Sequence, residues 1–122
     1  MNYKDAKKML GSREVKKLRY ATFLHNREDH FAIRHHATDI VRIYPRKVVF
    51  DCNGWKSKTT KERLNDYGPG TVWSQKGVWM VSYNGSEALY KDGMTFHSNG
   101  AITGGESVSE EKKQIQLRKE IK

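Results

Sequence analysis

DCNGWKSKTTKERLNDYG, residues 51–68, is the stretch of the sequence with the clearest signals of the fold. Asn53-Gly54 offers the positive-φ positions that a tight turn needs. Thr59 followed by Glu62 fits a capping box, which predicts that a helix begins there. Gly68 suits the left-handed residue just past the end of a helix. The stretch therefore predicts the end of a strand, a turn and one short helix.

Four cations lie in the same stretch, close to the predicted start of the helix: Lys56, Lys58, Lys61 and Arg63. The free N–H groups at the start of a helix attract anions. The best-defined signal of the fold is therefore also the first candidate for a binding site.

Alternating patterns before residue 51 predict antiparallel hairpins. Expected strands run from residue 17 to 24, over residues 31–33, over residues 39–44 and over residues 47–51. Within the third of these, a regular strand would place Ile40 on the face of Arg42 and opposite to Val41.

Turn signals of the Asn-Gly and Asp-Gly type recur after residue 68, at positions 84, 92 and 99. They separate expected strands over residues 71–75, 78–83, 88–90 and 94–97. Residues 3–10 predict a short helix with Tyr3, Ala6, Met9 and Leu10 on one face.

These elements predict an α+β fold: a small twisted antiparallel β-sheet or meander with one central helix and marginal terminal helices. We expect residues 1–106 to form a single α+β domain, and residues 107–122 to be a charged C-terminal helix or a flexible tail.

The net charge of +9 is uneven. Residues 1–50 hold 12 Lys and Arg against 5 Asp and Glu, a balance of +7, whereas residues 51–106 hold 6 of each. Such a field favours a polyanionic partner. Cys52 is the only cysteine, so no disulfide forms within the chain, and no apolar run is long enough for a membrane span. We expect a cytoplasmic protein with no cofactor and no membrane partner.

Three segments together resemble a family of small bacteriophage proteins: RHHATDIV at 34–41, GWKSKTTKERLN at 54–65 and QKGVWMV at 75–81. That family carries a His-x-Thr-Asp strand, a Gly-Trp-x-Thr-x-Thr-Thr-Lys-x-Arg segment and a Gly-aliphatic-Trp strand. The similarity covers residues 33–83 and departs from the pattern at Ser57 and Asn53. It implies a phage-encoded protein that acts in an infected bacterium, and it implies no mechanism.

The leading hypothesis is non-enzymatic binding of nucleic acid, DNA or RNA, through the residue 34–63 surface. Trp55 has two interpretations: it packs the helix onto the sheet, or it is a platform on which a base stacks. Trp79 is expected in the core. The predicted nucleic-acid-binding residues are Arg34, Arg42, Arg46, Lys47, Trp55, Lys56, Lys58, Lys61 and Arg63.

Two alternatives remain open. One is a phage inhibitor that binds an acidic face of a host defence or regulatory protein. The other is a small nuclease or nucleotide-processing enzyme, for which His36, Asp39 and Lys61 would supply acid–base chemistry near Cys52 or Thr60. No known hydrolase motif supports the enzyme, so we favour a protein without catalytic activity. The histidines lack neighbouring ligands at the spacing of a metal site, and none is predicted.

Overall fold

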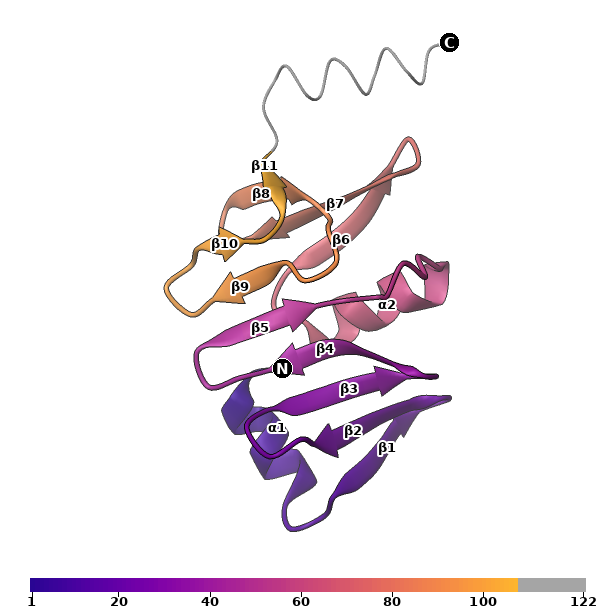
Figure 1. The fold of residues 1–122 in the computed structure, drawn as a ribbon, viewed down its shortest axis with the longest axis vertical. Helices are drawn as coiled ribbons and strands as arrows, with labels where there is room; N and C mark the ends of the chain where they lie inside the picture. Colours follow the sequence, from indigo (N-terminus) through magenta and orange to yellow (C-terminus); the bar gives the residue numbers. More distant parts are fainter. Residues whose placement is uncertain (108–122) are drawn as a thin grey trace.

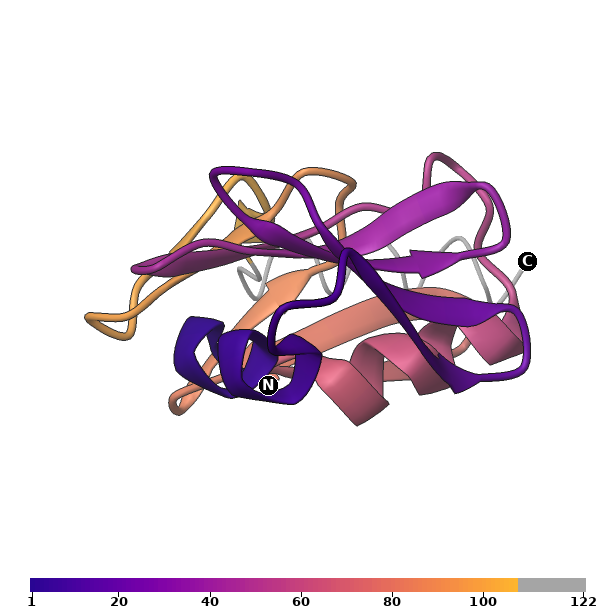
Figure 2. The ribbon, with the colours of Figure 1, turned by 90° about the horizontal axis from the view of Figure 1, so that it is seen from below.

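The computed structural model describes residues 1–107, which fold into two antiparallel sheets and two helices (Figures 1 and 2). The helices are α1 (Tyr3–Leu10) and α2 (Lys58–Tyr67). The large sheet has the order β1-β2-β3-β4-β5-β9-β10. Its strands are β1 (Val15–Arg19), β2 (Thr22–Asn26), β3 (Phe31–His35), β4 (Thr38–Ile43), β5 (Lys47–Phe50), β9 (Thr95–His97) and β10 (Ile102–Thr103).

The small sheet has the order β11-β8-β7-β6. Its strands are β6 (Thr71–Gln75), β7 (Val78–Tyr83), β8 (Ser86–Leu89) and β11 (Glu106–Ser107).

The predicted α+β class, the antiparallel pairing and the central helix are confirmed. The strands form two sheets because β9 returns to pair with β5, with Val48 opposite Phe96, which leaves β6, β7 and β8 to pair with one another. The division of the chain at residue 106 stays a prediction, since residues 108–122 lie outside the described part of the structure.

The continuous strand expected over residues 17–24 is wrong. The chain reverses at Tyr20-Ala21, where Ala21 has φ 52°, and Thr22 of β2 pairs back onto Arg19 of β1. Alanine seldom adopts a positive φ, so the residues of this turn do not predict it.

The expected face of Ile40 is also wrong. Ile33 of β3 pairs with Val41 of β4, but the next residue, Arg34, pairs with Asp39, so Ile40 is an extra residue in β4. Such a bulge lets consecutive side chains turn inward. Ile40 and Val41 are accordingly both buried, while Arg42 lies on the other face.

Both ends of α2 differ from the expected capping. Ser57 is the N-cap, because its Oγ accepts a hydrogen bond from the Thr60 N–H at 3.0 Å, and Thr59 lies inside the helix. Gly68 follows the helix with φ −91°, an ordinary extended conformation. Glycine is needed there for space: a Cβ atom would overlap the ring of Phe50 and lie 2.7 Å from the Leu64 carbonyl oxygen.

Helix α1 begins with a capping box between Asn2 and Asp5. Ala6 and Leu10 are buried as expected, whereas Met9 is 38% exposed. Tyr3 packs on Phe31 of β3 with the ring centroids 5.0 Å apart.

The two helices lie on the same face of the large sheet (Figure 2), where Leu64 of α2 is fully buried in the core. On its other side α2 borders the small sheet: the Asn65 side chain donates to the Val72 carbonyl and accepts from the Val72 N–H of β6. The helix therefore joins the two sheets, and the residues before it lie where the sheets meet. No helix among the described residues is long and apolar enough to cross a membrane.

We expect Gly68→Ala to lower the free energy of unfolding by about 1–3 kcal/mol, the usual range for an overpacked core. Urea denaturation measures this change. In a Phe50→Leu background, which removes part of the obstructing ring, the same substitution should cost less. An equal cost in both backgrounds would show that the Phe50 ring does not set the requirement for glycine.

Candidate functional site

The segment between β5 and α2, residues 51–57, is held in place by one carboxylate, and we call it the 51–57 loop. Asp92 accepts hydrogen bonds from the Cys52 N–H at 3.0 Å, the Cys52 Sγ–H at 3.1 Å and the Gly54 N–H at 2.8 Å. The Tyr90 hydroxyl also donates to Asp92, at 2.8 Å. Asn53 and Gly54 have φ 52° and 78°, so the predicted turn is confirmed.

These contacts shift the ionisation of the groups involved. Burial alone would raise the pKa of Asp92, but the hydrogen bonds from Cys52, Tyr90 and Gly54 outweigh it, so the pKa lies below its usual value. Burial raises the pKa of Cys52 to about 11, and the adjacent Asp92 carboxylate adds to the rise. The thiol is therefore protonated at neutral pH and is a poor nucleophile.

A hollow of about 460 Å³ lies on one side of the 51–57 loop, between the loop, the start of α2 and the β3–β4 turn. We call it the histidine pocket, and His35, His36, Ala37, Thr38, Trp55 and Thr60 bound it. The bulge in β4 also turns Ile40 toward it.

A second hollow, also about 460 Å³, lies on the other side of the loop beside the small sheet. We call it the lysine pocket, and Lys56, Val78, Trp79, Tyr90 and Lys91 bound it. The Lys56 Nζ lies 5.5 Å from the ring centroid of Tyr90 and 6.0 Å from that of Trp79. The Lys61 Nζ of α2 is also 6.0 Å from the Trp79 ring, so two ammonium groups contact one indole.

Trp55 does not pack the helix onto the sheet, because 75% of its surface is exposed. The other interpretation, a platform on which a base stacks, stays a prediction; Trp55 lies at the edge of the histidine pocket. Trp79 is half-buried rather than fully in the core, and it packs edge-on against Tyr90 with a centroid distance of 5.3 Å.

The lysines of this site form no ion pair with another side chain that the structure describes. Among the side chains of residues 1–105, the ion pairs are formed by arginines and by His30. Lys56, Lys58 and Lys91 are exposed. Arg34 lies nearby, since its Nε donates to the carbonyl oxygen of His36 at 3.1 Å.

Two other predicted cations are engaged in the fold. Arg63 is only 7% exposed, and it donates to the Thr22 hydroxyl at 3.2 Å and pairs with Asp66 at 3.4 Å. The guanidinium of Arg42 lies 3.9 Å from the carboxylate of Asp51.

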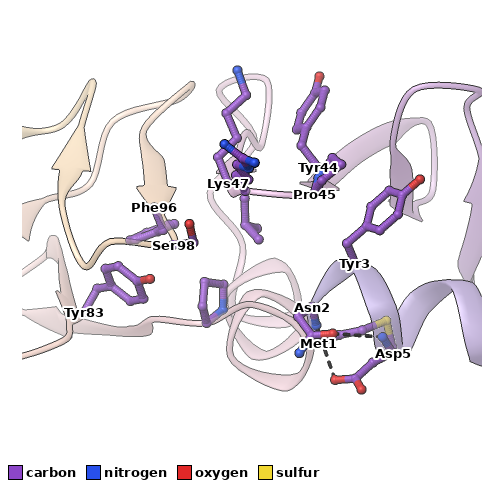
Figure 3. Close-up of a pocket in the computed structure, with 13 residues that line it drawn as sticks. Met1, Asn2, Tyr3, Asp5, Tyr44, Pro45, Lys47, Tyr83, Phe96 and Ser98 are labelled. Carbon is purple, nitrogen blue, oxygen red and sulfur yellow. Dashed lines mark hydrogen bonds between the residues drawn. The ribbon is translucent and has the colours of Figure 1, made fainter.

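Arg46 and Lys47 lie at the opposite end of the large sheet, in the β4–β5 turn and at the start of β5 (Figure 1). The four residues of β5, about 13 Å at 3.3 Å per residue, separate them from the 51–57 loop. They line a different pocket of about 250 Å³ (Figure 3), where the Lys47 Nζ lies 4.9 Å from the Tyr44 ring. The nine predicted residues therefore do not form one patch. Lys56 and Lys61 share the Trp79 ring, Trp55 and Lys58 lie close to Lys56 along the chain, and Arg34 contacts the β3–β4 turn.

The residues considered for catalysis are dispersed. Asp39 is held by Arg27 at 3.2 and 3.1 Å, His36 borders the histidine pocket, and Lys61 faces Trp79. No group of three or more His, Cys, Asp or Glu side chains within the described residues is arranged to hold a metal ion.

Three residues of the site were not singled out from the sequence, Asp92, Tyr90 and Lys91, and His35 was considered only as a metal ligand. Asp92-Gly93 predicts a turn, but the sequence does not show that the Asp92 carboxylate also accepts hydrogen bonds from the 51–57 loop. Tyr90 and Lys91 lie at the end of a predicted strand. That position does not indicate that the strand ends beside the 51–57 loop.

Comparison with protein families gives a match over most of the chain. The family model described as Kyanoviridae Gp96 protein matches residues 4–97, a wider span than the resemblance seen in residues 33–83. No curated protein and no solved structure matches the chain. The match includes every residue of the 51–57 loop and both pockets.

We expect Asp92→Asn to lower the free energy of unfolding at pH 7 by about 1–2 kcal/mol, because the amide accepts fewer of the four hydrogen bonds. The pKa of Asp92 is depressed in the folded state, so its contribution is complete above the unfolded pKa of about 4 and is lost as the pH falls through the folded pKa. The difference between the variant and the parent should therefore narrow below about pH 4.

Urea denaturation at pH 7 and at acidic pH measures both effects. Glu62→Gln, on an exposed position of α2, is the control that removes one carboxylate elsewhere. A pH-independent difference for Asp92→Asn would contradict the role of the ionised carboxylate.

Proposed function

The chain belongs to the Kyanoviridae Gp96 family of phage proteins, and we propose that it binds nucleic acid without catalysing a reaction. The binding surface is the 51–57 loop, the start of α2 and the two pockets beside the loop. This surface is smaller than the residue 34–63 surface expected from the sequence, because it omits Arg42, Arg46, Lys47 and Arg63 and gains Lys91.

One observation carries the proposal: an exposed indole, Trp55, lies next to lysines that form no ion pair with another described side chain. Proteins that bind single strands combine aromatic side chains, on which bases stack, with cations that follow the phosphates. Stacking of one base on such a ring contributes about 1–3 kcal/mol. Trp55 provides the ring, and Lys56 and Lys58 lie one and three residues further along the chain.

The rigidity of the loop supports the same proposal. Four hydrogen bonds to Asp92 fix the turn before Trp55, and Ser57 caps the helix directly after it. A backbone segment held at both ends loses little conformational entropy when a ligand binds to it.

Binding of a host protein is a second candidate, because exposed tryptophans are also typical of the centres of protein interfaces. A host inhibitor would bind one protein in a fixed stoichiometry and would bind it after nuclease treatment. Capture from infected cells, with and without nuclease, separates that function from nucleic-acid binding.

We expect Lys58→Glu combined with Lys61→Glu to weaken binding of a single-stranded oligonucleotide by about tenfold or more at moderate salt. The slope of log affinity against log salt should become shallower by about 1.4, since each phosphate contact on a single strand contributes about 0.7. Fluorescence anisotropy with a labelled oligonucleotide measures both quantities.

Lys4→Glu combined with Lys8→Glu, on the exposed face of α1, changes the net charge by the same amount away from the 51–57 loop. This control should lose much less affinity. Equal losses in the two double variants would show that only the total charge matters and that the loop is not the site.

A further inference from the structure

His35 borders the histidine pocket, and its hydrogen bonds indicate which of its ring nitrogens carries the hydrogen. The Thr22 hydroxyl donates its one proton to the Tyr20 carbonyl at 2.9 Å. It also lies 3.2 Å from the Arg63 Nε, which can only donate, and 3.1 Å from the Nδ1 of His35. With the hydroxyl proton directed at Tyr20, the tautomer that satisfies Thr22 and His35 together carries the hydrogen on Nδ1 and donates it to Thr22.

The second ring nitrogen of His35 is consequently the acceptor. The carbonyl oxygen of Ala21 is a second acceptor that the N–H of the His35 ring contacts. The residue is 6% exposed, and it borders the histidine pocket. Burial, with His36 and Arg63 nearby, lowers the pKa of His35, so the ring is neutral at pH 7.

This arrangement suits a flat, neutral ligand with an N–H group better than an anion. A neutral imidazole nitrogen accepts a hydrogen bond and offers no positive charge to a phosphate. Trp55 borders the same pocket with an exposed ring, and a volume of about 460 Å³ is in the range of small-molecule sites. Every unmodified nucleobase combines a flat ring with an N–H group on its Watson–Crick edge.

We propose that the histidine pocket takes up one unstacked nucleobase of a single-stranded segment, which stacks on Trp55 and donates an N–H hydrogen bond to Nε2 of His35. The inference rests on the proposed function, since it names how that same surface holds its ligand. The lysines beside the 51–57 loop contact the phosphates on either side of the bound base, and Arg34 fixes the turn that carries His36 and Ala37 at the far wall.

Three oligonucleotides of equal length and charge test the inference on the full chain: oligothymidine, the same oligomer of N3-methylthymidine, and an oligomer of abasic sites. N3-methylation keeps the flat ring and removes the only N–H of thymine. We expect oligothymidine to bind about tenfold more tightly than the abasic oligomer, the size of one stacked base. We expect the methylated oligomer to bind more weakly than oligothymidine.

Trp55→Ala should abolish the difference between oligothymidine and the abasic oligomer while keeping the salt dependence. Tyr44→Ala, an aromatic residue at the opposite end of the large sheet, is the matched control and should keep the difference. Thermal unfolding of each variant verifies that it is folded.

The outcomes separate the two proposals. Failure to bind any of the three oligomers overturns nucleic-acid binding itself. Salt-dependent binding that is equal for all three overturns only the base pocket. Equal binding of the thymidine and methylthymidine oligomers, both above the abasic one, overturns the hydrogen bond to His35.

Discussion

The carboxylate of Asp92 is the constraint on which the site depends. Its oxygens accept four hydrogen bonds, and three of the donors are on Cys52 and Gly54. Because Asp92 is distant in sequence from the loop that it holds, the position of the turn at Asn53-Gly54 is fixed by the β8–β9 connection. Trp55 and Lys56 follow directly from that turn, so the two pockets keep their common wall.

A second polar cluster fixes the opposite wall. Arg63 of α2 donates to Thr22 of β2, and Thr22 contacts His35 of β3, so the helix and two strands share one buried hydrogen-bonding centre. Leaving one of these polar groups unpaired in the core would cost about 1–3 kcal/mol. This cost holds Arg63, Thr22 and His35 in their relative positions. The cation that the sequence suggested as a ligand contact thus serves instead to orient the histidine of the pocket.

Local patterns predicted most of the strands and both helices, because alternation and turn residues are local signals. They failed where the cause was not local. The bulge at Ile40 arises from pairing with β3, Gly68 is required by a ring from β5, and the turn at Tyr20-Ala21 lacks the usual turn residues. The binding role of residues 55–61 stays a prediction, and the position of Arg46 and the burial of Arg63 depend on the tertiary structure.

The most direct test of this account is the NMR chemical-shift map of the labelled protein during titration with a single-stranded oligonucleotide. The account predicts that the largest changes fall on the indole N–H of Trp55 and on the backbone amides of residues 35–38 and 52–58. Changes centred instead on residues 44–48, at the other end of the large sheet, or spread evenly over all lysine-bearing segments, would contradict it.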